Sequence, residues 1–585
     1  MIFISILTLI VAKALPLLNK KISSIHFTRI ASIIFIYTGA ITFNCLYIQS
    51  IGSGIGIYSG LFHITQISQL IEIFLFLIGG LILMGWPHVN KNLNLSKTKN
   101  TADKFETLDQ ISEPVEASGR VESYSTDYSI IVLFSILGSS LLISSFDLIS
   151  LYLSIELQSF GLYVLSTLYR DSESSTSAGL KYFLLGGLSS CLILLGSGLI
   201  YSYTGLTNFE SLYLLNSISD IDQQYVIQGL SLGLIIIFVG FLFKIAAAPL
   251  HNWSPDVYDG TPTIVTTWLT IVPKISILIL LLELQSKIGI IGGIKTKILS
   301  STGYITDVEI MTNILPTDGL IYLSNTVSAS LVGLPVLKTL LLISSILSLI
   351  IGSLLGLAQI RIKRLLAYST ISHIGFLLLA LAINTEQSID SFLFYLIQYT
   401  ITNLNIFLII LALTYIIYNN GHSTGSTSEF NSFELKTYST KIGSIKDIRD
   451  ISDLKGLFFS NPLLSLSLGL CLFSMAGIPP LIGFFSKQFV LYSALQNGYY
   501  FISLIAIIVS VISASYYLKI IKVLHTLPNT LPDCKVNDEN EQRNALSNIH
   551  SFLISSLTLI ILLFFIKPSI ILNSTQLLSL SLFYI

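Results

Sequence analysis

Long apolar stretches recur along most of the chain and are separated by short polar segments. Because a helix needs about 20 predominantly apolar residues to cross a bilayer, each stretch is a candidate span. The pattern predicts an all-α polytopic membrane protein with about 14 transmembrane helices. The predicted spans are 2–18, 29–49, 68–86, 128–146, 148–169, 177–203, 229–249, 261–284, 336–357, 364–383, 390–418, 461–484, 499–521 and 550–567.

Two of these spans are predicted to be broken helices. In FKIAAAPLHNWSPDVYDGTPT, Pro249 and Pro255 follow an apolar run, and in SMAGIPPLIGFFSKQF another run ends at Gly477, Pro479 and Pro480. Proline removes a helical hydrogen bond, and inside a membrane such a break persists only where it lines a cavity or is buried in protein. Interrupted spans at corresponding places in two halves are typical of inverted-repeat transporters. We therefore predict two inverted five-helix repeats, with the seventh and twelfth spans broken.

The repeats and three polar inserts divide the chain into five parts. The inserts, rich in Ser, Thr, Asn, Glu and Lys, are expected to be surface loops, and no chemistry is assigned to them. The predicted parts are three N-terminal helices with a polar loop (1–127, insert 88–127), the first repeat (128–285), a polar insert (286–335), the second repeat (336–525, insert 419–460), and a loop with the last helix (526–585).

The composition agrees with a membrane protein. Of 585 residues, 52% are hydrophobic and 11% are charged, which excludes a soluble globular class and nucleic-acid binding. The net charge of -1 predicts no polyanionic partner, and membrane lipids are the expected surroundings. The cysteines are widely separated and form no CxxC or Cys/His cluster, and no dinucleotide-binding fingerprint is present. We therefore expect no metal and no cofactor in this chain.

Positive charge falls on alternate loops. Basic residues follow the fifth and ninth spans (Arg170 and Arg361), whereas acidic residues follow the sixth and tenth (Glu210 and Glu386). By the positive-inside rule, both termini are expected on the face opposite the basic loops. The N-terminal segment lacks a basic region, a cleavage site and the Arg/Ser-rich pattern of a transit peptide, so it is expected to be a retained first span.

Five charged residues lie inside apolar stretches: Glu156, Lys181, Lys244, Lys274 and Lys487. A charge at bilayer depth costs about 3 kcal/mol or more, so such residues face a bundle interior or a hydrated cavity and usually mark an ion path. A desolvated lysine can exchange a proton near neutral pH. The set therefore predicts movement of a cation, with the proton as the first candidate.

Each of these charges also has an alternative interpretation. Lys244 lies five residues before Pro249 and could snorkel from a helix end, an alternative that also applies to Lys487 and most strongly to Lys181, near the start of its span. Glu156 is either a lone protonated carboxyl or the partner of a lysine. Lys244 and Lys181 are both candidates for that pair.

Other titratable residues have weaker signals. His373 lies well inside a span and is either an interhelical hydrogen-bonding residue or a proton carrier. Glu72, Asp147 and Glu283 lie near span ends and are expected at the membrane interface.

Four segments in order carry a resemblance to a known family: AGLKYFLLGGLSS, FKIAAAPLHNWSPDVYDGTPT, IKRLLAYSTISHIGFLLLA and SMAGIPPLIGFFSKQF. They resemble the antiporter-like membrane subunits of respiratory NADH:quinone oxidoreductase (complex I), over residues 125–525. The resemblance implies that Glu156 and Lys244 form the carboxylate–lysine pair of a first half-channel. It also implies that Lys274 is a central relay lysine and Lys487 the lysine of a second half-channel, and Lys181 matches an additional family lysine.

The resemblance further implies a proton-translocating subunit with no redox centre of its own. Flavin, iron–sulfur clusters and ubiquinone are expected in partner subunits, which include peripheral subunits and neighbouring antiporter-like subunits. Three spans ahead of the repeats resemble a fungal-type enzyme of the mitochondrial inner membrane. A lysine at 487 and a short apolar tail after Pro568 differ from two other subunit types, which generally carry a glutamate there or add a long lateral helix.

Two alternatives remain at this point. The first is a subunit of a Na⁺/H⁺ antiporter, since that superfamily shares the motifs. The second is a structural membrane subunit whose lysines form inert pairs and hold neighbouring subunits together.

Overall fold

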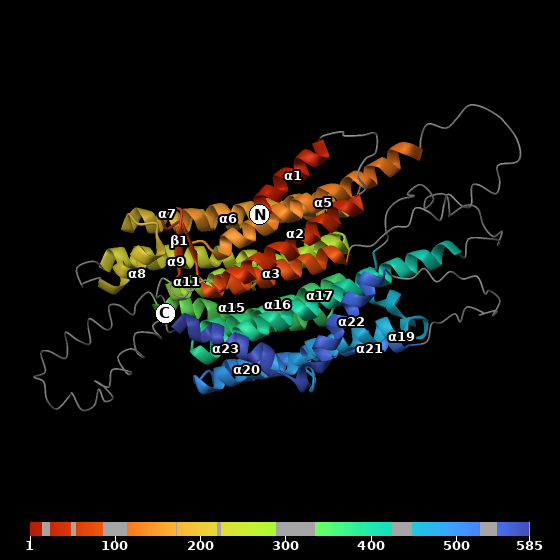
Figure 1. Ribbon diagram of the computed structural model, residues 1–585. Coiled ribbons are helices and arrows are strands. Elements are labelled where there is room, and N and C mark those ends of the chain that lie inside the picture. The colour runs from red at the N-terminus through yellow and green to blue at the C-terminus, as the bar shows by residue number, and fades with distance from the viewer. Residues whose placement is uncertain are drawn as a thin grey trace, which may run out of the picture.

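The computed structural model describes residues 1–14, 24–47, 54–85, 114–170, 172–218, 224–287, 334–423, 447–526 and 547–583. Within these ranges the chain is almost entirely α-helical (Figure 1). The greater part of the three predicted polar inserts lies outside the described residues. The first insert was predicted to be a loop up to residue 127, but its described part is helical from Pro114, where α5 begins.

The N-terminal part contains three helices and a short hairpin, α1 (Ile2–Ala14), α2 (Ser24–Cys45), β1 (Ile55–Ile57), β2 (Phe62–Ile64) and α3 (Gln66–Met84). The two strands are antiparallel, with Gly56 opposite His63. Thr65 begins α3 with a capping box, in which its hydroxyl accepts from the backbone N–H of Ser68 and the Ser68 hydroxyl accepts in return. This reciprocal cap satisfies two donors that the first turn would otherwise leave unpaired.

The first half of the chain then forms seven helices. They are α5 (Pro114–Ile143), α6 (Leu148–Thr167), α7 (Glu173–Thr204), α8 (Phe209–Ile218), α9 (Gln224–Lys244), α10 (Trp253–Gly260) and α11 (Thr263–Lys287). Asp147 caps α6 through a hydrogen bond from the backbone N–H of Ile149, and Gly205 ends α7 in the left-handed conformation that glycine adopts without strain.

The second half repeats this pattern and adds a C-terminal extension. Its elements are α15 (Leu334–Leu357), α16 (Ile362–Ile383), α17 (Glu386–Ser423), η5 (Ile451–Leu454), α18 (Leu457–Ser460), α19 (Pro462–Ala476), α20 (Ile482–Gln496), α21 (Tyr500–His525), α22 (Asn548–Leu563), η6 (Phe564–Ile566) and α23 (Ser569–Phe583).

Every predicted span overlaps a helix of the structure. Ten helices in the described ranges are long and apolar enough to cross a membrane, and the other four predicted spans fall on the shorter apolar helices or helix segments of α1, α5, α9 and α19. The count of fourteen spans therefore stays a prediction, while the all-α membrane fold is confirmed.

Both predicted helix breaks are present. The seventh span is interrupted between α9 and α10, and the twelfth between α19 and α20. At the first break Ala246 has a φ of 61°, and at the second Gly477 has a φ of 88°. These left-handed residues turn the chain where proline prevents the helix from continuing.

The two halves pack side by side, with the first half in orange to yellow-green and the second in green to blue (Figure 1). Within their most apolar windows, 94% of residues in α11 and in α16 are buried, against 33% in α7. α11 packs on both α5 and α17, so it joins the halves. The helices at the centre are thus surrounded by protein, which is where an intramembrane charge is least costly.

Candidate functional site

Glu156 and Lys244 face each other across two helices. Lys244 Nζ at the end of α9 lies 3.7 Å from Glu156 Oε1 in α6, and the two side chains are 7% and 14% exposed. Neither atom has a hydrogen-bond partner among the described residues. The two charges therefore compensate each other without being locked by a hydrogen bond, which is what a pair that opens and closes requires.

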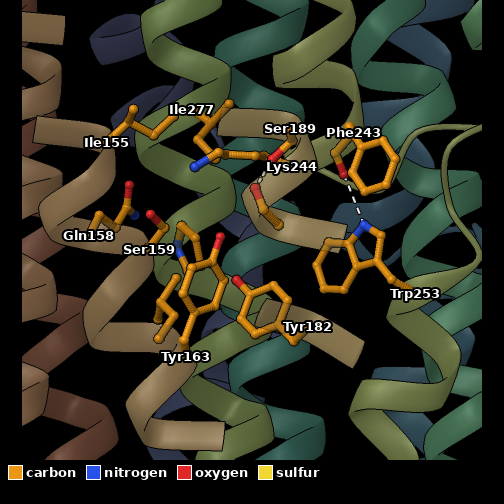
Figure 2. A pocket seen from close by; sticks show the side chains of 13 residues that line it. Ile155, Gln158, Ser159, Tyr163, Tyr182, Ser189, Phe243, Lys244, Trp253 and Ile277 are labelled. Atoms are coloured by element: carbon orange, nitrogen blue, oxygen red, sulfur yellow. Dashed lines mark hydrogen bonds between the residues drawn. The ribbon is translucent and has the colours of Figure 1, made fainter. Parts of the chain in front are cut away.

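A small cavity lies beside this pair (Figure 2). Its volume is about 20 Å³, enough for one water molecule, since a cavity needs about 10–15 Å³ to hold one. The lining includes Lys244, hydroxyl and amide groups from Gln158, Ser159 and Tyr163, and Pro273 of α11. The cavity is thus shared by α9 and α11, and Pro273 is the residue before Lys274.

Lys274 lies at the centre of the bundle and is 3% exposed. Its Nζ donates to Thr370 Oγ1 in α16 (3.0 Å) and to Tyr399 OH in α17 (3.3 Å), and it lies 5.5 Å from the ring centre of Tyr258 in α10. No carboxylate of the described residues lies within ion-pair distance of it. A lysine held only by neutral groups keeps no fixed counter-charge, so it can exist with or without its proton.

His373 connects three helices. Its Nδ1 lies 2.6 Å from Tyr395 OH in α17 and its Nε2 lies 3.3 Å from Tyr517 OH in α21, while its ring centre is 5.9 Å from that of Tyr399. The predicted interhelical hydrogen bonding is thus present. Its proximity to Tyr399, which Lys274 contacts, also keeps the proton-carrier interpretation open.

Lys487 lies at the second break. From α20 its Nζ donates to the backbone oxygens of Met475 and Ala476, at 2.9 Å each, and lies 5.8 Å from the ring centre of Phe376. These oxygens end α19, where the helix dipole favours a positive charge. Phe376 stacks on Tyr395, the hydroxyl partner of His373, so side-chain contacts run from Lys274 to Lys487.

Lys181 lies apart from the Glu156–Lys244 pair and from the contacts that run from Lys274 to Lys487. Its side chain is 55% exposed on α7 and its Nζ lies 3.0 Å from Asp256 Oδ2, so it does not pair with Glu156. Of the two lysines that the sequence allowed as partner of Glu156, the structure brings Lys244 to it.

The structure also shows charged groups that sequence reasoning missed. Asp256 and Asp259 of α10 bind Arg364, at 3.0 and 3.2 Å, and Asp259 also binds Arg361. The hydrogen bond and the negative charge of Asp259 raise the pKa of Arg361 above its usual value. Asp447, in an insert given no chemistry, lies 2.7 Å from Lys363. The i, i+3 spacing of both the acids and the arginines was the available signal.

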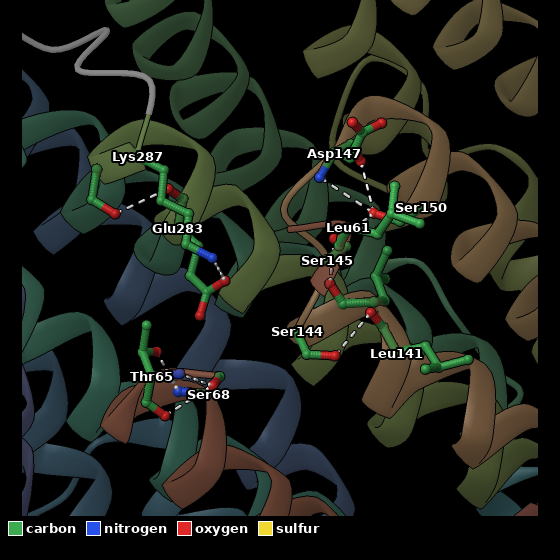
Figure 3. A network of polar contacts seen from close by, with 12 residues as sticks. Leu61, Thr65, Ser68, Leu141, Ser144, Ser145, Asp147, Ser150, Glu283 and Lys287 are labelled. Carbon is green, nitrogen blue, oxygen red and sulfur yellow. Dashed lines mark hydrogen bonds and ion pairs between the residues drawn. The ribbon is translucent and has the colours of Figure 1, made fainter. Parts of the chain in front are cut away.

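A second polar cluster lies at the far end of α11 (Figure 3). Glu283, which we expected at the interface, is 2% exposed and pairs with Lys287 at 2.9 Å. The ring of Phe146 lies between Lys287 and His63, and burial together with the Lys287 charge lowers the pKa of His63. The expected position of Glu283 at the membrane interface stays a prediction.

Among the residues that the structure describes, no group of three or more His, Cys, Asp or Glu side chains is arranged to hold a metal ion.

Comparison with known proteins identifies the family. The model of the NADH:quinone oxidoreductase/Mrp antiporter transmembrane family matches residues 145–308 and 305–513. The chain is 45% identical to NADH-ubiquinone oxidoreductase chain 2 of Rhizopus oryzae, with 100% of each chain covered, and 35% identical to chain 2 of Marchantia polymorpha, with 75% and 74% covered. A chain of respiratory complex I from Thermus thermophilus shares the fold, with a TM-score of 0.63, 22% identity, and 98% and 99% coverage. The chain therefore belongs to the NADH:quinone oxidoreductase/Mrp antiporter family of membrane subunits.

Proposed function

We propose that this chain is a core membrane subunit of mitochondrial NADH:ubiquinone oxidoreductase that contributes to proton translocation across the inner membrane. Relatives at 45% and 35% identity carry the name of chain 2 of that enzyme, which favours this function over a sodium antiporter. The observation that carries the proposal is the row of buried titratable side chains through the centre of both halves. Its members are Glu156, Lys244, Lys274, His373 and Lys487.

The Glu156–Lys244 pair is the switchable part of this path. While the pair is closed, the carboxylate stabilises the charged lysine. When a nearby charge or a movement of α9 opens the pair, the lysine loses its counter-charge and releases its proton toward the cavity beside it. The cavity reaches Pro273, so the next acceptor along the path is Lys274.

Lys274 relays the proton because its partners, Thr370 and Tyr399, are neutral groups that tolerate both charge states. From there the path continues through the Tyr399 and His373 contacts toward Lys487. The basic loops indicate uptake from the matrix side and release on the opposite side.

This chain supplies no redox chemistry in the proposal. Electron transfer from NADH to ubiquinone takes place in partner subunits, which hold the flavin and the iron–sulfur clusters. Those partners include peripheral subunits and neighbouring antiporter-like subunits, and the energy reaches this chain through conformational or electrostatic coupling.

The test is Lys274→Ala in the intact enzyme complex, reconstituted in vesicles. Because the lysine has no carboxylate partner, its removal strands no charge, and the complex should assemble normally on native gels. Proton pumping should fall about a hundredfold or more, within the range that loss of a positioned proton-transfer group costs in enzymes. Lys338→Ala is the matched control, because Lys338 contacts Tyr499 away from the row.

Wild-type pumping by assembled Lys274→Ala would sink the relay role and favour a structural subunit with inert lysines. Pumping that depends on sodium in the wild-type enzyme would instead support the antiporter alternative.

A further inference from the structure

The short helix α10 contacts the chain next to Lys244 at its start and contacts Lys274 near its end. At its start, Trp253 Nε1 donates to the backbone oxygen of Phe243 (2.9 Å), the residue before Lys244. Near its end, the Tyr258 ring lies beside Lys274 Nζ. Residues 261–262 alone separate α10 from α11. A shift of α10 therefore changes the surroundings of both lysines.

Four charged side chains fasten α10 to the beginning of α16, and we call them the α10–α16 clasp: Asp256, Asp259, Arg361 and Arg364. Arg364 donates from Nη2 to Asp256 Oδ1 and from Nε to Asp259 Oδ2, and Arg361 also binds Asp259. Both acids and both arginines are three residues apart, which places each pair on one side of its helix. The two helices are thus held in a fixed register.

A second set of contacts, made by the buried Lys363 and by Asp447, also joins α10 and α11 to α16. Lys363 is 3% exposed, and its Nζ donates to the backbone oxygen of Thr261 (2.9 Å) and to Asp447 Oδ2 (2.7 Å). The same Asp447 oxygen accepts from the backbone N–H of Thr263 (3.1 Å), the first residue of α11. The junction between α10 and α11 is therefore tied to α16 as well.

The clasp joins the two helices that flank Lys274. Tyr258 comes from α10 and Thr370 from α16, and both contact the Lys274 ammonium. Arg361 is 48% exposed, and exposed ion pairs contribute little to the free energy of unfolding, so stability alone does not explain the clasp. A role in positioning explains it better, because a proton relay depends on donor and acceptor positions within about an ångström.

We propose that the α10–α16 clasp is a positioning device that holds Tyr258 and Thr370 around Lys274, and so sets the geometry in which Lys274 exchanges its proton. The inference rests on the proposed function, since it assigns positioning residues to the same path. Asp259 is its central member because it binds both arginines and its side chain is only 8% exposed.

The test is Asp259→Asn in the intact reconstituted complex, with proton pumping measured across a range of pH. We expect an assembled complex whose pumping falls about tenfold, because a displacement of about 1 Å costs up to about a hundredfold in positioned reactions. The pH profile should also shift, because the Lys274 surroundings change. Asp259→Glu retains the charge and should recover more than half of the pumping rate.

The matched control is Asp127→Asn, which breaks the ion pair with Lys13 far from the row. Asp259→Asn with the rate and pH profile of this control would overturn the clasp. If Asp259→Asn does not assemble, Arg361→Gln removes only the exposed partner and should lower pumping about threefold. Loss of assembly in both variants would assign the clasp to folding and also overturn it.

The same series separates this inference from the proposed function. Impaired Lys274→Ala with normal Asp259→Asn would reject the clasp alone. Normal pumping by both variants would reject the proposed function.

Discussion

Each of the two helix breaks has a lysine beside it, but the two lysines lie on opposite sides of their breaks and have different partners. The left-handed residues Ala246 and Gly477 occupy the same place in the two breaks, and Pro249 and Pro480 each follow them by three residues. Lys244 ends the helix before its break and faces a carboxylate, whereas Lys487 follows its break and donates to two backbone oxygens. Two residues before the left-handed position, where the first break has Lys244, the second break has Met475.

The difference is one of electrostatics. A Glu–Lys pair is sensitive to any nearby charge, because each partner stabilises the charged form of the other. A lysine on the carbonyl end of a helix is held by fixed dipoles that do not titrate. Similar sequence patterns thus place a lysine beside a carboxylate in one half and beside backbone oxygens in the other.

The largest effect is expected at the first break. Glu156→Gln or Lys244→Met leaves a buried charge without its partner, which typically costs about 3–5 kcal/mol unless the group neutralises. Either variant should strongly reduce proton pumping by the reconstituted complex. The double variant should lose no more than the worse single one, because both act on one switch.

Glu156→Gln combined with Lys181→Met is the control for that cycle. Lys181 binds Asp256, so its loss should add to that of Glu156. Additive losses for Glu156 and Lys244, with coupling to Lys181 instead, would mean that the pair is wrongly assigned.

A smaller effect is expected from Lys487→Met. The change removes hydrogen bonds to Met475 and Ala476 but strands no charge, whereas Lys244→Met leaves the Glu156 carboxylate without its partner. The loss of thermal stability should therefore be below that of Lys244→Met. Combined with Glu156→Gln, the two losses should add within about 0.5 kcal/mol, and strong coupling would contradict the contrast between the breaks.

Gly477→Ala tests the geometry of the second break. Gly477 has a φ of 88°, and an added Cβ would lie 3.1 Å from Lys487 Cδ and 3.4 Å from its Nζ. We expect a loss of about 1–2 kcal/mol from the left-handed backbone, with lower pumping because the lysine is displaced. Gly469→Ala in the same helix is the control, since its Cβ would meet no atom within 4 Å. Equal stability and pumping for the two variants would reject this explanation.

The smallest effect is expected from Ala246→Gly at the first break. Ala246 has a φ of 61°, so glycine relieves about 1 kcal/mol of strain and loses a similar amount through its greater freedom in the unfolded chain. The melting temperature should stay close to that of the wild type. Ala247→Gly, which relieves no left-handed strain, should be less stable by about 0.5–1 kcal/mol, and the opposite order would contradict the strain at position 246.

Several features could be predicted because their causes are local. The length of apolar runs located the spans, and the missing N–H of proline located both breaks. The high cost of charge in a membrane pointed to five residues. Glu156, Lys244, Lys274 and Lys487 are enclosed within the bundle, whereas the Lys181 side chain is 55% exposed.

Other features could not be predicted because they depend on which helices become neighbours. No role was predicted for the acids of α10, and Asp447 lies in an insert with no assigned chemistry. Arg361 and Arg364 come from the other half, 102 and 108 residues after their partners Asp259 and Asp256, and Lys363 lies 84 residues before Asp447. The i, i+3 spacing within each segment marks residues on one side of a helix, but it does not say which other segment they will face.

Hydropathy and proline chemistry act over a few residues, so the amino-acid sequence alone is enough to establish a helical membrane protein with two broken spans and buried titratable groups. The choice of Lys244 over Lys181 as the partner of Glu156 came from the packing of the helices, as did the contact of Lys487 with backbone oxygens instead of a carboxylate. An ion pair forms over a few ångströms, and the packing of helices that are distant in sequence sets those distances.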